Sequence, residues 1–436
     1  MPERDTFGLT PETTIRDSLY DLVPLSAEAA AILSAPPFLR LDGVQQLGFV
    51  SRVWPGARHT RFEHSLGVMH LAREALVRLI HDGAPVSDRG ARTAIAAALL
   101  HDIGHYPFSH AIEELGPPIS PHEAVARHLI LDDPLDAILR AQWEVDPIDV
   151  ANLIDPPGPP RSIEERLLRS LLSGALDVDK LDYLPRDARA CAVPYGGVDS
   201  TRLLDALTVI ERTDGPAIAI RHKGISPLHS LINARQEMFD NVYWHHTNRA
   251  CMAMLLRAVQ DAIRAGLDPA ELPRHTDSSL LERLSQEDMP ETTRRLVAGL
   301  RERRIHKRAV EISYRAPDLF AFLGHLFFDP ERRRALEQSM VARLRELTGH
   351  QIREADILID IPKPERWRTQ VWVQFDRPPV GFQPVMTWQD FTGIDDSSLR
   401  IYEEHRRLIR IVASEPIQQL VNEHWEQITL PLLAQA

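Results

Sequence analysis

A helical repeat of apolar residues runs from Glu63 to about Ala265 and constrains the fold more than any other feature of the chain. One helix face is formed, at steps of three and four residues, by Leu66, Met69, His70, Arg73, Leu76, Val77 and Ile80. A second helix is expected from about Arg89 to His101, because Gly104 and Pro107 follow at once. The repeat predicts a mainly α fold with a large helical core.

Strand patterns are few and lie later in the chain. Leu207–Arg212 and Ala217–Arg221 flank Asp214-Gly215, which predicts a small β-hairpin. One long helix is expected from about Pro227 to Ala265. Further strands are expected at Ala309–Tyr314, Asp356–Ile361 and Gln370–Phe375, and further helices at about Pro330–Leu347 and Ser398–Ala413. We therefore expect a core over residues 1–265 and a smaller α+β region over residues 266–436.

Charge and cysteine content narrow the class of protein. The 50 basic and 62 acidic residues give a net charge of −12, which argues against a generally basic, nucleic-acid-binding surface. Two cysteines, Cys191 and Cys251, are too few for a disulfide framework. The N-terminus lacks the features of a signal peptide, and no apolar run approaches the roughly 20 residues that span a bilayer. We expect a soluble protein of the cytoplasm.

Histidines and carboxylates gather at three places where the helical pattern begins or breaks. These stretches are Arg61–Ser65 (RFEHS), His101–His110 (HDIGHYPFSH) and Asp177–Tyr183 (DVDKLDY). A single buried histidine more often satisfies a core hydrogen bond than binds a metal, but several ionisable groups at one helix break are costly without a function. The best set of metal ligands is His64, His101, Asp102 and Asp179. Such nitrogen and oxygen ligands suit iron, manganese, nickel, zinc or magnesium.

The segments RFEHSLGV, LLHDIGHYPFSH and DVDKLDYLPRD together resemble the HD-domain phosphohydrolases. The branch they resemble most is that of the deoxynucleoside triphosphate (dNTP) triphosphohydrolases, which includes dGTPase-like enzymes. The resemblance covers roughly residues 30–265. It implies an HD-domain helical core and the metal-dependent hydrolysis of dNTPs to deoxynucleoside and inorganic triphosphate.

The resemblance also implies roles for individual residues. It assigns the metal to the four ligands named above, and the catalytic pocket to His105, His110, Glu113 and His122. Within this pocket His110 would donate a proton to the departing 5′-oxygen and Glu113 would orient it. The implied substrate-binding residues are Gln46 and Asp187 at the sugar 3′-hydroxyl, Tyr183 against the deoxyribose, Arg61, Lys180 and Arg235 on the triphosphate, and Tyr243 two turns beyond Arg235. The residues alone leave open that Arg61 pairs with Glu63, or that Arg235 is a solvated helix residue.

Three positions depart from the pattern of the resembled family. Leu39 and Asp42 stand where nucleotide-activated relatives carry glutamine and arginine, so we expect no obligatory activation by a guanine nucleotide. Phe239 stands where relatives place a histidine, so part of the phosphate-binding shell is expected to differ.

The sequence also leads to expectations about oligomeric state and partners, and it leaves two alternative functions open. The family implies an even-numbered homo-oligomer, a dimer or tetramer. The apolar strands expected in residues 266–436 need partners, so we expect this region to serve oligomerisation or regulation; the alternative is that it simply folds onto its own core. No membrane partner is expected, and nucleic-acid binding is not indicated. Two alternatives stay open: hydrolysis of another phosphoester (a nucleoside monophosphate, a cyclic dinucleotide or an oligonucleotide), or a non-catalytic nucleotide sensor.

Overall fold

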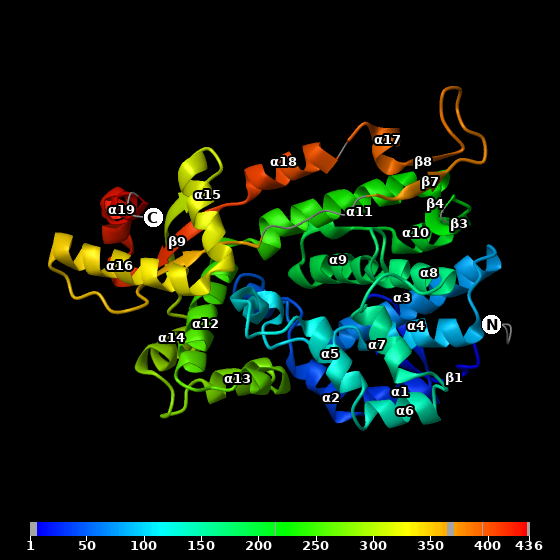
Figure 1. Cartoon of the computed structure of the whole chain (residues 1–436), viewed down its shortest axis with the longest axis horizontal. Helices are drawn as coiled ribbons and strands as arrows, with labels where there is room; N and C mark the ends of the chain where they lie inside the picture. Colours follow the sequence, from blue (N-terminus) through cyan, green and yellow to red (C-terminus); the bar gives the residue numbers. More distant parts are fainter. Residues whose placement is uncertain (1–6, 214, 364–369, 395, 434–436) are drawn as a thin grey trace.

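The structure is a computed structural model that describes residues 7–213, 215–363, 370–394 and 396–433. The molecule is elongated and has two lobes, which lie side by side in Figure 1. Residues up to about 245 build the lobe that contains the N-terminus. Residues from 246 onward build most of the other lobe, and a later segment of the chain crosses back over the first.

The first lobe is almost entirely helical. Its helices are α1 (Ala27–Leu33), α2 (Pro36–Leu39), η2 (Arg40–Gly43), η3 (Gly48–Arg52), α3 (Arg61–His81), α4 (Asp88–Leu100), η4 (Ser109–Leu115), α5 (His122–Ile130), α6 (Leu135–Ala141), α7 (Pro147–Ile154), α8 (Ile163–Ser173), α9 (Val178–Cys191), η5 (Pro194–Gly196), α10 (Ser200–Ala206), η6 (His222–Gly224) and α11 (Ile225–Met238). Its strands are β1 (Pro11–Asp17), β2 (Asp21–Ser26), β3 (Leu207–Ile210) and β4 (Ala217–Arg221). The helix α3 is central, because it packs on both α4 and α9.

The second lobe combines helices with short strands. Its helices are α12 (His246–Arg264), η8 (Pro269–Arg274), α13 (Asp277–Arg283), α14 (Glu291–Arg301), α15 (Pro317–His325), η9 (Leu326–Phe328), α16 (Pro330–Thr348), η10 (Glu415–Ile417) and α19 (Gln418–Leu433). Its strands are β5 (Lys307–Ile312), β6 (Ile357–Asp360) and β9 (Ile409–Ala413), which form an antiparallel sheet in the order β5-β9-β6.

The segment that crosses back to the first lobe contains β7 (Trp372–Gln374), β8 (Val385–Thr387), α17 (Trp388–Thr392) and α18 (Asp396–Arg406). It adds two strands to the predicted hairpin and gives a four-stranded sheet in the order β3-β4-β7-β8, with β7 parallel to β4. Figure 1 shows α17 and α18 lying along α11. The predicted domain boundary at residue 265 stays a prediction. Elements on its two sides contact each other, as β4 and β7 do in this sheet.

The mainly α fold with a small hairpin and a C-terminal α+β region is confirmed. The predicted hairpin is β3 and β4, paired from Leu207↔Ile220 to Ile210↔Ala217. Asp214 in its turn lies outside the described residues. Sequence reasoning did not anticipate the N-terminal hairpin of β1 and β2. In the part of the chain that the structure describes, every helix is too short or too polar to cross a membrane.

The expected single helix from Pro227 to Ala265 is wrong at its centre. The chain widens into a π turn, η7 (Phe239–Tyr243), and restarts as α12. Two contacts stabilise this break: the Tyr243 hydroxyl donates to Asp187 Oδ2 on α9 at 2.6 Å, and Asn248 Nδ2 donates to the Tyr243 carbonyl at 2.9 Å. A side chain thus satisfies a backbone acceptor at the interruption.

The expected helix over Ser398–Ala413 is wrong in its second half. After α18 ends at Arg406, residues 409–413 form β9, the central strand of the second lobe's sheet. Every residue of β9 is buried, and Ile409, Ile411 and Val412 are β-branched. Such residues suit a strand paired on both edges better than a helix.

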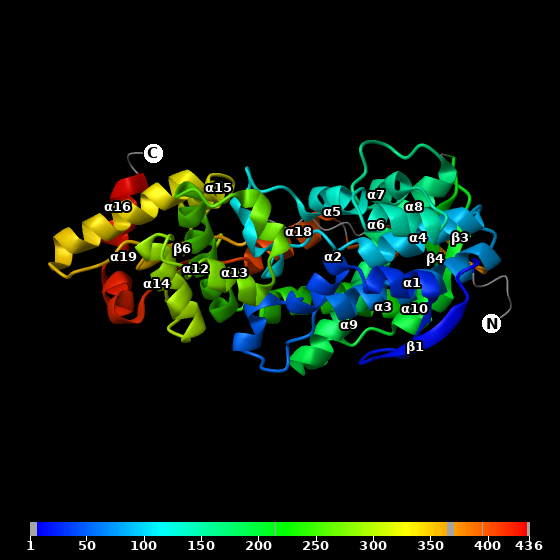
Figure 2. The same cartoon turned by 90° about the horizontal axis from the view of Figure 1, so that it is seen from below.

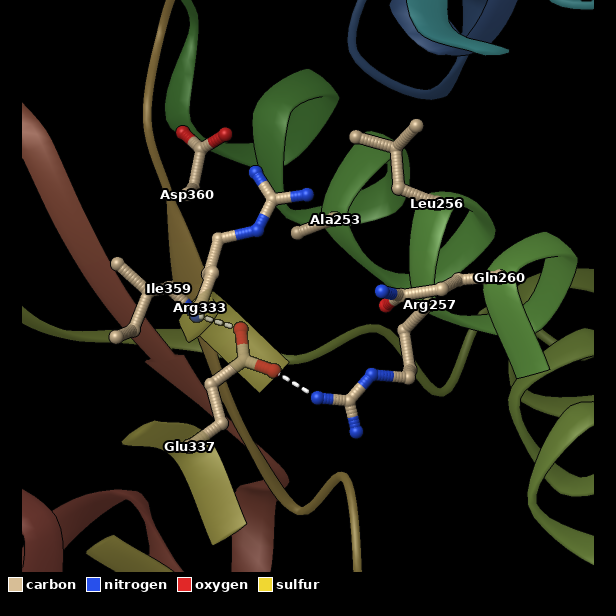
Figure 3. Close-up of a pocket in the computed structure, with 8 residues that line it drawn as sticks. All are labelled: Ala253, Leu256, Arg257, Gln260, Arg333, Glu337, Ile359 and Asp360. Carbon is tan, nitrogen blue, oxygen red and sulfur yellow. Dashed lines mark hydrogen bonds and ion pairs between the residues drawn. The ribbon is translucent and has the colours of Figure 1, made fainter. Parts of the chain in front are cut away.

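Buried ion pairs tie α12 to its surroundings. Arg249 donates to Glu114 Oε1 of η4 at 2.9 Å and to Asp360 Oδ1 of β6 at 2.9 Å, so one guanidinium joins the two lobes. Two turns further along α12, Arg257 forms an ion pair with Glu337 Oε2 of α16. The other carboxylate oxygen, Glu337 Oε1, accepts from the Ile359 amide at 2.8 Å (Figure 3). These pairs fix α12 to the first lobe and to the sheet and the helix α16 of the second lobe.

Candidate active site

Three helices bring the four predicted metal ligands to one point. His64 lies in the first turn of α3, His101 caps the C-terminal end of α4, and Asp179 lies in the first turn of α9. The His64 Nε2 atom is 3.3 Å from His101 Nε2 and 3.0 Å from Asp179 Oδ1. Asp102 completes the group, with its Oδ1 3.3 Å from His101 Nε2. We call these four residues the HD cluster.

Each histidine of the HD cluster is oriented through its other ring nitrogen. His64 Nδ1 lies 2.7 Å from Asp182 Oδ2, and His101 Nδ1 lies 2.8 Å from the Ala98 carbonyl. Asp182 is itself held by Arg186 Nε at 2.8 Å and by the Tyr20 hydroxyl at 2.8 Å. A donating Nδ1 leaves the Nε2 lone pair directed at the centre, which is the usual arrangement around a metal-binding imidazole.

A close approach of α3 and α9 makes this orientation possible. A Cβ atom at Gly67 on α3 would lie 1.9 Å from Asp182 Oδ1 and 2.5 Å from Arg186 Nη2. Glycine at position 67 therefore lets the Asp182–Arg186 pair reach behind His64.

The donor set of the HD cluster fits a divalent cation. Two imidazole lone pairs and two carboxylates converge within 4 Å, and this arrangement is repulsive unless a positive charge lies among them. Burial lowers the pKa of His64, but hydrogen bonds to Asp179 and Asp182 outweigh it and raise that pKa to about 10, so a metal ion bound here would take the place of a proton on Nε2. The site therefore attracts positive charge, and nitrogen with oxygen ligands suits manganese, iron, nickel, zinc or magnesium.

A second group, of three histidines and one glutamate, adjoins the HD cluster. Its members are His105, His110, Glu113 and His122. Glu113 bridges two of them, with Oε2 2.8 Å from His110 Nδ1 and Oε1 2.9 Å from His122 Nδ1. The His105 and His122 rings stack with centroids 3.8 Å apart. His105 Nε2 also lies 3.2 Å from Asp102 Oδ1 and so connects the two groups. We call the four residues the Glu113 cluster.

The Glu113 cluster holds its members in different charge states. Burial alone would raise the pKa of Glu113, but hydrogen bonds from His110 and His122 lower it overall. Burial opposes charge on His122, yet its bond to Glu113 raises the pKa of its imidazole. Burial, together with Arg61 and His122, holds the pKa of His105 well below its ordinary value. His110 is the member that faces solvent, with 62% of its side chain exposed.

The predicted sugar-binding residues lie on α9 and the loop before η3. Asp187 is buried and both its oxygens are engaged, by His59 Nε2 at 2.8 Å and by the Tyr243 hydroxyl at 2.6 Å. Gln46 Oε1 is buried and has no hydrogen-bond partner among the described residues. Tyr183 is half-buried, and Arg235 shares a hydrogen bond with its hydroxyl. The unsatisfied Gln46 oxygen suits a hydroxyl donor of a ligand.

The three predicted phosphate-binding cations each have protein contacts. Arg61 pairs with Asp102, not with Glu63, and its Nε donates to Ser109 Oγ at 3.2 Å. Lys180 pairs with Asp177 and donates to the Gly174 carbonyl at 3.2 Å. Arg235 lies over the Phe239 ring, 5.0 Å from its centroid. An incoming polyanion would have to draw Arg61 and Lys180 from these carboxylates.

Sequence reasoning missed the residues that orient the site. Asp182 stands between the predicted Asp179 and Tyr183, and His59 stands two residues before Arg61. Their proximity to the motifs was the available signal. Tyr20, in the turn between β1 and β2, gave no signal, because only the folded chain brings it to Asp182.

Comparison with known proteins agrees with this geometry. Residues 61–187 match the family model described as the HD domain, and residues 198–377 match the model described as the HD associated region. An uncharacterised protein of Methanocaldococcus jannaschii is 31% identical over 366 residues, which are 83% of this chain and 72% of the relative. A deoxynucleoside triphosphate triphosphohydrolase homologue of Dictyostelium discoideum is 31% identical over 320 residues, 68% of this chain and 60% of the relative.

A solved structure of a hypothetical protein from Aquifex aeolicus has a TM-score of 0.72 with 23% identity and covers 95% of this chain and 99% of its own. That likeness concerns the fold. The chain spans less than two thirds of the Dictyostelium relative's length. Two consecutive family models and a similar relative covered over most of its length establish membership: the chain belongs to the HD-domain family that carries an HD-associated region.

Proposed function

We propose that this protein hydrolyses deoxynucleoside triphosphates to deoxynucleoside and inorganic triphosphate with the help of a divalent metal ion. The observation that carries the proposal is the direct contact of two different clusters through Asp102 and His105. One cluster concentrates donors for a cation, and the other holds an exposed imidazole against a half-buried carboxylate. The similarity to relatives named deoxynucleoside triphosphate triphosphohydrolases supports the substrate class.

The HD cluster would hold the metal through His64, His101, Asp102 and Asp179. A divalent ion bound there would withdraw charge from the phosphate and lower the pKa of water. Arg61 lies beside Asp102 and is placed to stabilise negative charge that develops on the α-phosphate.

The Glu113 cluster would supply the proton for the leaving group. His110 is exposed to a ligand, and Glu113 accepts at its Nδ1, so Nε2 is the atom that faces outward. Proton donation from Nε2 to the departing 5′-oxygen makes the deoxynucleoside a neutral alcohol. His122 and His105 complete the wall behind this pair.

Sugar selection would come from Tyr183 and Gln46. Tyr183 would pack against C2′ and leave little space for a 2′-hydroxyl, while Gln46 Oε1 would accept from the 3′-hydroxyl. Asp187 would act through its partners His59 and Tyr243, because both its oxygens are engaged. Lys180 and Arg235 would turn toward the triphosphate on binding, since a polyanion attracts both cations.

We further propose activity as a homo-oligomer without obligatory guanine-nucleotide activation. Leu39 is 51% exposed and Asp42 is also exposed, so this surface offers an apolar side chain and a negative charge to a nucleotide. Light scattering with and without GTP, beside activity assays, measures both parts. A fully active monomer would overturn the assembly, and an assembly that works only with GTP would overturn the independence from an activator.

A substrate panel tests the proposed function. The panel is dNTPs, NTPs, a dNMP and a cyclic dinucleotide, each with manganese, iron, nickel, zinc or magnesium, and kcat/KM is compared. We expect dGTP to be preferred over GTP by at least about 10-fold, and Tyr183→Ala to reduce that ratio. Equal kcat/KM for dGTP and GTP in both the wild type and Tyr183→Ala would contradict the proposed sugar selection. Hydrolysis of the monophosphate but of no triphosphate would contradict the proposed substrate class.

A further inference from the structure

The start of α13 in the HD-associated region touches two active-site segments at once. Asp277 is buried, and its carboxylate accepts from two backbone amides: Gln45 N at 3.1 Å to Oδ2, and Phe108 N at 2.7 Å to Oδ1. Figures 1 and 2 place α13 on the side of α12 and α14 that faces α2 of the first lobe. One side chain from the second lobe thus links two segments of the first that are far apart in sequence.

Both linked segments carry candidate substrate and proton-transfer groups. Gln46 follows Gln45, and His110 follows two residues after Phe108. The turn is strained, because Phe108 and Ser109 have φ values of 59° and 60°, in a left-handed region that larger side chains rarely adopt. Ser109 Oγ lies 2.9 Å from the carbonyls of both Gln45 and Gln46, so the two segments also contact each other directly. Such strain persists only where the surroundings fix the backbone.

Arg40 ties the same part of the second lobe to the helix break between the clusters. Its Nη1 donates to the His275 carbonyl at 3.0 Å, and its Nη2 donates to the carbonyls of Ile103 at 2.8 Å and His105 at 3.0 Å. The fit is tight: a Cβ atom at Gly43 would lie 2.4 Å from Thr276 Cγ2. Residues 275–277 therefore contact the Gln45 segment and the Phe108 turn directly, and reach the helix break at residues 103–105 through Arg40.

The Asp277 carboxylate is not needed for its own helix. Thr276 caps α13 by accepting from the Ser279 amide, and Ser279 bonds back to the Thr276 amide. Burial raises the pKa of Asp277 to about 6, although both amides and the charges of Arg61 and Arg40 lower it. A buried carboxylate that its own helix does not require is costly, so it calls for another role.

We propose that Asp277 is a positioning residue, which with Arg40 sets the distance between the Gln46 loop and the turn that carries His110. The HD-associated region then contributes to the chemistry without touching substrate. This inference rests on the proposed function for its kinetic part, and on the two amide bonds alone for its structural part.

The first test replaces one acceptor. In Asp277→Asn a single carbonyl oxygen can still accept from one amide, and the other amide loses its partner. We expect metal content to be unchanged, KM for dGTP to change by less than about 3-fold, and kcat to fall about 10- to 100-fold, because a displacement near 1 Å costs that much. The matched control is Asp268→Asn, since Asp268 caps η8 in the same region and its side chain accepts from the nearby Ala270 amide.

A double-mutant cycle separates positioning from loss of stability. If Asp277 acts through His110, then His110→Ala costs at least about 5-fold less in the Asp277→Asn background than in the wild type. Additive losses would overturn the proposal. Arg40→Lys gives a second route: it keeps the charge but cannot reach three carbonyls, and we expect a smaller fall in kcat in the same direction.

Amide hydrogen exchange tests the structural part without any assay of activity. At least one of the two amides, that of Gln45 or that of Phe108, should exchange at least about 10-fold faster in Asp277→Asn, and both should exchange at the wild-type rate in Asp268→Asn. Unchanged exchange at both amides would overturn the positioning role. Faster exchange in a protein that hydrolyses no dNTP would retain this part and reject the proposed function alone.

Discussion

The two clusters of the candidate active site use the same residue types but differ in how they are held. The HD cluster is mounted at the ends of the long helices α3, α4 and α9, and its histidines are fixed by Asp182 and by the Ala98 carbonyl. The Glu113 cluster is mounted on the turn before η4, on η4 itself and on the start of α5, with His110 largely exposed. Long packed helices hold ligands at fixed distances, whereas the turn that carries His110 is held by contacts from the second lobe and leaves the His110 side chain exposed.

This difference in support suits the HD cluster to metal binding and the Glu113 cluster to proton donation. Metal ligands must keep a fixed geometry, and the outer partners of the proposed ligands His64 and His101 would provide it. A proton donor must instead meet a leaving group that moves during the reaction, so an exposed imidazole oriented through one nitrogen is appropriate. The comparison predicts that damage to one cluster removes the metal, while damage to the other removes turnover and leaves the metal.

The largest expected effect follows from removing an HD-cluster ligand. Asp179→Ala, or the double variant His101→Ala/Asp102→Ala, should lose metal and lower kcat/KM by at least about 10⁴-fold, because the charge stabilisation by the ion disappears. Metal analysis and circular dichroism of the purified variants measure occupancy and helical content. Asp205→Ala, which removes an exposed carboxylate on α10, is the control. Full metal occupancy in both ligand variants would place the metal elsewhere.

A smaller loss is expected in the Glu113 cluster. His110→Ala should keep its metal and lower kcat about 10²- to 10³-fold, since only proton donation to the leaving oxygen is lost. A substrate with a more acidic leaving group should recover part of that loss in the variant. Loss of metal from His110→Ala would mean that the Glu113 cluster also holds the metal, and would contradict the division of tasks between the two clusters.

The smallest effect concerns stability and its pH dependence. Replacing Glu113 by glutamine breaks its charged bonds to His110 and His122, which should cost about 2 kcal/mol of the free energy of unfolding. The lowered pKa of Glu113 gives stability that is complete above its unfolded value of 4.5 and is lost as pH falls through its folded value. The raised pKa of His122 gives stability that is complete below 6.5 and is lost as pH rises through its folded value.

The two contributions overlap between about pH 4.5 and 6.5. Thermal unfolding of wild type and Glu113→Gln across pH 4–9 should therefore show the largest difference in Tm inside that window. A difference that keeps growing above pH 7 would mean that His122 is not the cation of the pair.

Much of the site could be anticipated because its motifs are local. His101 and Asp102 are adjacent, and Asp179 and Tyr183 share one helix, so a sequence shows them as groups. What holds them is not local: Tyr20 reaches Asp182 across 162 positions, and Asp277 reaches Phe108 across 169. Periodicity carries no information about such contacts, so they appear only in the folded chain.

The errors in the fold have the same origin. Residues 409–413 continue a helical pattern from α18, but pairing with β5 and β6 on both edges makes them a strand. The interruption at Phe239–Tyr243 depends on the Tyr243 contact with Asp187. In both places a tertiary contact outweighs local preference.

The most direct test of the account follows oxygen from water into product. The metal-loaded protein is incubated with dGTP in ¹⁸O-labelled water. The products are then separated, and mass spectrometry measures the ¹⁸O content of each. Attack of water on the α-phosphorus with departure of the 5′-oxygen predicts equal amounts of deoxyguanosine and inorganic triphosphate, with one ¹⁸O atom in the triphosphate and none in the deoxyguanosine. Formation of dGMP and pyrophosphate, label in the deoxyguanosine, or no hydrolysis of any deoxynucleoside triphosphate would contradict the account.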